Sequence, residues 1–327
     1  RHAGRLTIEL DALVTRVLFD ASNRAVGVEF LKGERLYRAH ANPSPEAGLR
    51  RSVRARREVI LAAGAFNTPQ LLMLSGIGPA DHLAAHAVPV RVDLPGVGRN
   101  LQDRYEVCVV HQMKFAEWEA LKGATFSPGD PHYQEWKTLR EGFYTGNGAV
   151  IAAILRSAPE RPVPDLFCFA LLTRFSGYFP GYSKVIAESL NHLSWAVLKG
   201  HTNNRGGVVR LKSADPRDRP AIDFHYFEEG TGDHRQDLDS VVTGVKFVRD
   251  LMRPLKRLGV GYEEILPGPQ VASDDDIRHF VRTRSWGHHA SCTCPIGADG
   301  DPNAVLDSAF RVRGTKGLRV EIGRAHV

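Results

Sequence analysis

Residues 64–78 read GAFNTPQLLMLSGIG and follow the apolar run EVILAA at residues 58–63. The apolar run is typical of a buried strand, and the small residues after it favour a tight turn. Thr68 and Pro69 then predict a helix start, with Thr as the N-cap and Pro at the first helical position. Glycines at the end of the stretch are expected to stop the helix. The stretch therefore predicts a strand–turn–helix unit.

Length, composition and charge limit the classes of protein to which this chain can belong. The chain has 327 residues, 43% of them hydrophobic, and a formal net charge of +6. It is long enough for one large domain or two smaller ones. The arginine cluster at residues 50–57 lacks the interleaved aromatic residues of a nucleic-acid surface, so we interpret it as the solvated face of a hairpin. No apolar run reaches the length of a membrane span.

Four cysteines are too few and too scattered for a disulfide framework. Cys292 and Cys294 lie only two positions apart, where a bridge would be strained. We therefore expect reduced thiols in a cytoplasmic protein, with peripheral membrane contact left open.

Apolar runs separated by Gly, Pro and Asp predict strands along the chain. In the first hundred residues these are 6–10, 14–19, 26–31, 36–40 and 53–63. Further on, runs at 107–114, 149–156, 166–172, 207–212 and 221–226 predict an antiparallel sheet, accompanied by an amphipathic helix at 237–255. The aromatic residues within 175–182 and 195–201 fit either the wall of a substrate pocket or the core.

Most of the chemistry lies in SWGHHASCTCPIG at residues 285–297. A neutral imidazole is suited to accept a proton near pH 7. The pattern leaves three alternatives open: a zinc site, although the Cys-x-Cys spacing fits zinc poorly, a Cys292 thiol nucleophile beside His289, and a purely structural histidine. A serine hydrolase is disfavoured, because Met73 stands where the nucleophile elbow at Ser75 requires glycine.

Residues 58–78 and 285–297, in this order, resemble two signatures of the glucose–methanol–choline (GMC) family of flavin-dependent alcohol oxidoreductases. The Cys-Thr-Cys turn is similar to the choline-dehydrogenase-like branch, and the resemblance covers most of residues 6–320. It implies an α/β FAD-binding (Rossmann-like) domain and an α+β substrate domain with an antiparallel sheet. It also implies FAD as cofactor and oxidation of a small-molecule alcohol to an aldehyde or ketone, with the hydride passing to flavin N5. The electron acceptor, quinone, dye or oxygen, stays open.

The resemblance also assigns site residues. His289 is implied as the catalytic base, and His288 is implied as a neighbour that binds the cofactor. Val14, Ala63, Gly64 and Thr68 are implied to contact FAD, and no metal is expected. The implied domains are 1–103 for FAD binding, 104–284 for substrate binding, and 285–320 for a return to the FAD-binding domain.

The chain is expected to be partial. A Gly-x-Gly-x-x-Gly turn for the FAD pyrophosphate is missing, and so is the family's C-terminal closing segment. Residues 321–327 are expected to be a non-native tail, because their last letters, IGRAHV, match one reading frame of a common sequencing adapter. His326 is accordingly not expected to be the second catalytic His or Asn, which the family places after a proline further along.

Two other functions remain open at this point. Some relatives in the family bind FAD but act as cyanohydrin lyases without redox chemistry. Alternatively, residues 1–327 on their own form a non-functional fragment that cannot hold FAD. Bleaching of the flavin by an alcohol without oxygen distinguishes an oxidoreductase from a lyase.

Overall fold

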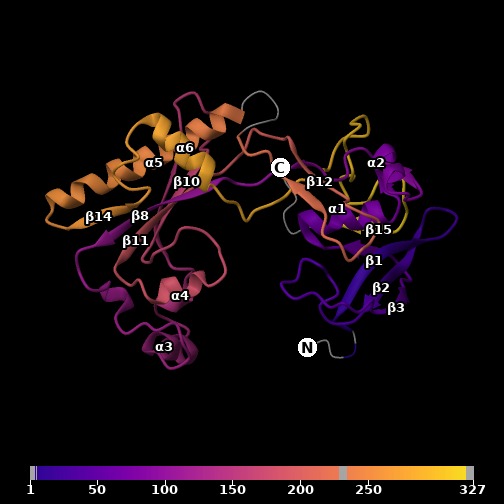
Figure 1. Cartoon of the computed structure of the whole chain (residues 1–327), viewed down its shortest axis with the longest axis horizontal. Helices are drawn as coiled ribbons and strands as arrows, with labels where there is room; N and C mark the ends of the chain where they lie inside the picture. Colours follow the sequence, from indigo (N-terminus) through magenta and orange to yellow (C-terminus); the bar gives the residue numbers. More distant parts are fainter. Residues whose placement is uncertain (1–3, 5, 228–233, 322–327) are drawn as a thin grey trace. The chain divides into compact units, whose positions relative to one another are not determined.

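The computed structural model describes residues 4, 6–227 and 234–321. The chain divides into two compact units (Figure 1). Unit 1 comprises residues 1–102, 205–225 and 289–327, and unit 2 comprises residues 103–204 and 226–288. The predicted non-native tail lies outside the described residues, apart from Glu321.

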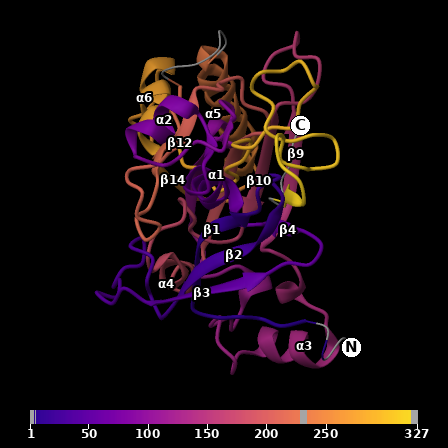
Figure 2. The same ribbon diagram turned by 90° about the vertical axis from the view of Figure 1, so that its right-hand side faces the viewer.

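Unit 1 contains four small sheets and two helices among its described residues. Its first sheet has the antiparallel order β1-β2-β3, and these strands lie side by side in Figure 2. The elements of unit 1 are β1 Ala12–Phe19, β2 Ala25–Lys32, β3 Leu49–Arg54, β4 Val59–Leu61, α1 Gly64–Leu74, β5 Ile77–Gly78, α2 Ala80–Ala85, β6 Val92–Asp93, β7 Arg99–Leu101, β12 Gly207–Arg210, β13 Ala221–Asp223 and β15 Leu318–Val320. The arginine cluster falls on the exposed strand β3 and the residues that follow it.

Strand β4 leads directly into α1, as the sequence predicts, and pairs in parallel with β15 from the far end of the chain. Helix α1 begins earlier than expected. It starts at Gly64 with Ala63 as the N-cap residue, so Thr68 and Pro69 lie inside the helix and not at its start. The prediction was wrong because it applied a local rule for Thr-Pro, whereas the turn after β4 is made at Gly64, whose φ of +78° suits glycine, and the helix continues directly from it.

The predicted strand 53–63 is divided in the structure, where β3 ends at Arg54 and β4 begins at Val59. Two other predicted strands of unit 1 are wrong. Residues 36–40 form turns, in which the His40 N–H donates to the Tyr37 carbonyl at 3.0 Å. Residues 6–10 form no strand either. Their apolar side chains are about 70% exposed, so the alternation of the sequence corresponds to no buried face.

Unit 2 is built on a five-stranded antiparallel sheet of order β14-β8-β11-β10-β9. Helices α5 and α6 cover one face of it, as Figure 1 shows. The elements of unit 2 are β8 Glu106–Met113, η1 Glu119–Leu121, α3 Pro131–Leu139, η2 Phe143–Thr145, β9 Ala149–Leu155, β10 Leu166–Leu171, α4 Tyr182–Ala187, β11 His192–Lys199, α5 His234–Arg257, β14 Tyr262–Leu266 and α6 Asp274–Arg284. The antiparallel sheet and the long helix α5 confirm the outline of the sequence prediction. Of the five strands predicted for the sheet, three correspond to β8, β9 and β10, whereas 207–212 and 221–226 correspond to β12 and β13 of unit 1.

Two features of this organisation were not predicted. All eight residues of β11 are buried, so the central strand carries no alternating pattern in its sequence. The second concerns residues 205–225, which the sequence prediction placed in the segment 104–284. They belong to unit 1, because β12 pairs with β7.

A buried ion cluster holds the end of β11. The Lys199 ammonium lies 2.8 Å from an Asp165 carboxylate oxygen and 3.9 Å from one of Asp237, and its side chain is only 2% exposed. Asp237 in turn accepts hydrogen bonds from the backbone N–H groups of Asn203 and Asn204. The cluster therefore ties β11, α5 and the segment leading out of unit 2 together.

Replacing Lys199 with Met should destabilise unit 2 by about 3–5 kcal/mol, because it removes the buried cation shared by the Asp165 and Asp237 carboxylates. Lys246→Met is the matched control, since its ion pair with Asp274 is half exposed and should contribute at most about 1 kcal/mol. Urea unfolding of the full-length protein measures both. Equal losses in the two variants would show that the Lys199 cluster contributes no special stability.

Candidate functional site

Glu106, the first residue of β8, is an unusual carboxylate. Its side chain is 1% exposed, and neither of its oxygens has a hydrogen-bond donor within the described part of the chain. Burial and, to a smaller extent, the negative charge of nearby Asp103 together raise the pKa of Glu106 to about 7. Such a carboxylate titrates near neutral pH and would be stabilised by a cation.

A reciprocal backbone pair fixes Glu106 in place. The Glu106 N–H donates to the Trp286 carbonyl at 2.9 Å, and the Trp286 N–H donates to the Glu106 carbonyl at 3.0 Å. Residues paired in this way across two antiparallel segments present their side chains on the same side. Gly287 follows at a position where a Cβ would lie 2.2 Å from an Asp103 carboxylate oxygen, so a larger residue does not fit.

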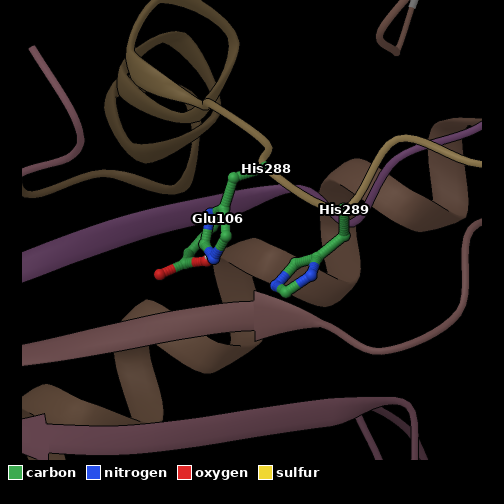
Figure 3. A group of neighbouring side chains, drawn as sticks. All are labelled: Glu106, His288 and His289. Carbon is green, nitrogen blue, oxygen red and sulfur yellow. The ribbon is translucent and has the colours of Figure 1, made fainter. Parts of the chain in front are cut away.

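His288 lies next to Glu106, as Figure 3 shows. Its Nδ1 atom is 3.7 Å from a Glu106 carboxylate oxygen, and its ring contacts the Tyr178 ring edge to face with centroids 4.9 Å apart. The next residue, also drawn in Figure 3, is His289, the predicted base. The predicted roles of both histidines remain predictions.

A series of aromatic ring contacts in unit 2 begins at His288 and Tyr178. Phe175 contacts both Tyr178 and Trp286, with centroids 5.1 and 6.0 Å apart, and Tyr178 contacts Tyr182 at 5.2 Å. The first of the two aromatic segments considered as a pocket wall is thus brought together with Trp286. Trp195, from the other segment, packs instead in the core cluster under α5, separate from the cluster that contains Phe175.

The turn after His289 belongs to unit 1 and is fixed by backbone hydrogen bonds. Ser291 and Gln102 exchange two such bonds, of 2.9 and 3.1 Å, and the Thr293 carbonyl accepts from the Gly98 N–H at 2.9 Å. Cys292 adopts a φ of +74° between them. All four cysteines are free thiols, as predicted, and burial raises the pKa of Cys294 to about 12.

Three of the predicted cofactor residues lie where β4 meets α1. Val14 and Ala63 line a hollow of about 490 Å³ between β1, β2 and β4. Gly64 has open space where a Cβ would be placed. Thr68 is fully buried, and its Oγ1 accepts a hydrogen bond from the Ala63 N–H at 3.1 Å, so it supports the turn from inside.

A larger cavity, of about 940 Å³, lies beside the turn at residues 292–296 within unit 1. Its wall combines the basic residues Arg99 and Arg205 and the acidic residues Asp301 and Glu321 with apolar residues such as Ile296 and Phe310. Such a wall can contact a ligand that has both charged groups and an apolar part, with the two arginines as the partners for its anionic groups. Neither arginine was predicted as a site residue from the sequence.

Glu106 was also not named from the sequence. The signal was present, because a single acidic residue opens the otherwise apolar run EVCVV. A charge at that position is expected to be exposed at the strand end. Its burial depends on residues 286–288, which are remote in the sequence.

Comparison with known sequences identifies relatives of one family along most of the chain. Two family profiles, both described as GMC oxidoreductase, match residues 2–106 and 202–321. The chain is 33% identical to human mitochondrial choline dehydrogenase over 332 residues, covering 96% of this chain and 49% of that protein. It is also 33% identical to an oxygen-dependent choline dehydrogenase of Rhizobium rhizogenes, covering 97% and 53%. The chain thus spans about half the length of the curated relatives it matches.

Solved structures with the same fold include flavoproteins. A formate oxidase from Aspergillus oryzae, described with its FAD, superposes with a TM-score of 0.73 at 23% identity, over 94% of this chain and 54% of that one. An FAD-dependent oxidoreductase from Chaetomium thermophilum gives 0.69 at 26% identity, over 97% and 57%. Within the described residues, no helix has the length and apolar character needed to cross a membrane.

The raised pKa of Glu106 predicts a pH dependence of stability. A carboxyl group whose pKa is higher in the folded state than its ordinary 4.5 stabilises the fold below that value, and the effect is lost as pH rises through about 7. Glu106→Gln does not titrate, so the wild type should lose stability relative to this variant across that window. Urea midpoints measured at several pH values test this, with the exposed Glu263→Gln as control. Parallel profiles for wild type and Glu106→Gln would contradict it.

Proposed function

The chain belongs to the GMC oxidoreductase family, and we propose that the whole protein oxidises a small cationic alcohol of the choline type with FAD. The observation that carries this proposal is the buried Glu106 carboxylate, which has no hydrogen-bond donor among the described residues. An anion in such a place is costly unless a positive charge compensates it. A substrate ammonium group would supply that charge.

The aromatic residues near Glu106 support the same substrate class. Trp286 is its backbone partner, and Tyr178 is close enough that the Glu106 charge contributes to the raised pKa of the phenol, after burial, which is the largest cause. Quaternary ammonium groups bind well against the faces of Trp and Tyr rings. A carboxylate together with such rings recognises a cation of low hydration better than either feature alone.

The residues of unit 1 fit the cofactor. FAD is the cofactor supported by the family and by the flavoprotein neighbours. We assign the backbone at Val14, Ala63 and Gly64 to its binding, because a flat ligand can approach small residues closely there. Thr68 stabilises the turn at Ala63 through its hydrogen bond, and His288 is proposed as a further cofactor contact. Arg99 and Arg205 offer charges that suit phosphate groups.

His289 is proposed as the base. When FAD is bound, it supplies the acceptor for the two electrons that leave the alcohol carbon. The imidazole of His289 then takes the hydroxyl proton, so that charge does not build up on the oxygen. His288 does not serve as the base in this proposal, because its ring is engaged with Glu106 and Tyr178.

Replacing each histidine in the FAD-loaded full-length protein tests this assignment. His289→Ala should lower the rate of alcohol-dependent flavin bleaching by about 100- to 10,000-fold, the usual range for a positioned general base, and leave FAD binding nearly unchanged. His288→Ala is the matched neighbour and should cost far less. Stopped-flow absorbance gives both rates. Equal losses, or a loss confined to His288→Ala, would place the base elsewhere.

Replacing Glu106 with Gln tests the substrate class. The KM for choline should rise about 10- to 100-fold, because an attraction between buried charges is lost. The KM for the neutral tert-butyl analogue, in which carbon replaces the ammonium nitrogen, should change by less than about 3-fold. Steady-state kinetics of the wild type and Glu106→Gln with both alcohols test whether Glu106 recognises the cation. A similar change for both alcohols would mean that Glu106 does not recognise the cation.

A further inference from the structure

Helix α1 carries a proline in its interior. Pro69 is the sixth residue of the helix, and it has no N–H to donate to the carbonyl of Ala65 four positions earlier. Ala65 is 8% exposed, so water does not readily replace the missing donor. A buried carbonyl left without a donor costs free energy comparable to a lost hydrogen bond.

Thr293, from the turn after His289, supplies the donor. Its Oγ1 lies 2.7 Å from the Ala65 carbonyl oxygen and donates a hydrogen bond to it. The Thr293 side chain is fully buried, and the bond connects residues that are 228 positions apart in the chain. A hydroxyl from the turn thus occupies the place of the helix hydrogen bond that Pro69 removes.

The other bonds of this turn lead to different segments. Ser291 is bonded to Gln102, the Thr293 carbonyl to Gly98, and the Pro295 carbonyl accepts from Val305 and Leu306. These bonds attach the turn to segments other than α1. The hydroxyl of Thr293 connects it to the N-terminal half of α1, where Gly64 and Ala63 lie.

We propose that Thr293 is a positioning residue whose hydroxyl, paired with the proline at position 69, sets the register of the 289–295 turn on helix α1. The proposal rests on the function given above, since it is His289 whose backbone this turn carries. Pro69 is the necessary partner. With an N–H at position 69, the helix itself would donate a hydrogen bond to the Ala65 carbonyl. The Thr293 hydroxyl would then compete with that bond for the same acceptor.

A double-mutant cycle in the FAD-loaded full-length protein tests the pairing. The four proteins are wild type, Thr293→Val, Pro69→Ala and the double variant. Thr293→Val should lower kcat about 10- to 100-fold with little change in KM, because small misplacements of a reacting group have costs of this size. It should also lower the urea midpoint. In the Pro69→Ala background both losses should shrink, with kcat recovering at least about 10-fold, because an alanine at this position offers its own N–H to the Ala65 carbonyl.

Two further variants serve as controls. Thr293→Ser keeps the hydroxyl and should retain kcat within about 3-fold of wild type. Thr315→Val loses a comparable hydroxyl bond, that of Thr315 Oγ1 to the Val312 carbonyl at 2.8 Å, and should leave kcat unchanged. These controls separate a role in positioning from a general loss of a hydroxyl bond.

The outcomes are distinct. Equal effects of Thr293→Val in both backgrounds, or no effect on kcat, would overturn the proposal. If Thr293→Val does not fold, recovery of folded, flavin-containing protein by Pro69→Ala supports the pairing, and failure to recover it overturns the pairing. If the wild type shows no alcohol oxidation, the proposed function fails, but the urea midpoints of the same four proteins still decide whether residues 69 and 293 are coupled.

Discussion

The reciprocal backbone pair between Glu106 and Trp286 is the constraint from which the chemistry of this chain follows. It brings the start of β8 against the segment that leads to the two histidines. The backbone N–H groups of both residues are used by this pair and are therefore not available to the Glu106 carboxylate. The carboxylate itself is buried without a hydrogen-bond donor among the described residues, 3.7 Å from His288 Nδ1. A site of this kind is costly to maintain, which is a reason to connect it with function.

Local patterns in the sequence predicted a large part of the fold. The strand–turn–helix unit at β4 and α1, the antiparallel sheet of unit 2 and helix α5 are all encoded by short-range apolar periodicity, and the structure contains them. Patterns failed where burial is not periodic. Strand β11 is buried along its whole length, and residues 6–10 alternate without being buried at all. Residues 205–225 could not be assigned to unit 1, because pairing between β12 and β7 leaves no local mark in the sequence.

In the candidate site, too, some residues are marked by local sequence motifs, whereas others depend on partners far away in the chain. The histidine segment at 285–297 and the turn at Ala63 and Gly64 are continuous motifs, so a resemblance to a family could find them. Glu106 and Thr293 matter through partners that are far away in the chain, Trp286 and Ala65 respectively. The position of Pro69 illustrates the point. A local rule places proline in the first turn of a helix, whereas here a hydroxyl from another segment satisfies the carbonyl and allows proline further inside.

The proposed reaction removes two electrons from a cationic alcohol. The most direct measurement of it is the flavin absorbance of the FAD-loaded, full-length wild type after choline or its neutral tert-butyl analogue is added in the absence of oxygen. We expect that choline bleaches the flavin, and that it does so at concentrations at least about 10-fold lower than the neutral analogue. Cleavage of a cyanohydrin with the flavin remaining oxidised under all alcohols would contradict the proposed reaction, and bleaching that favours the neutral analogue would contradict the role of Glu106.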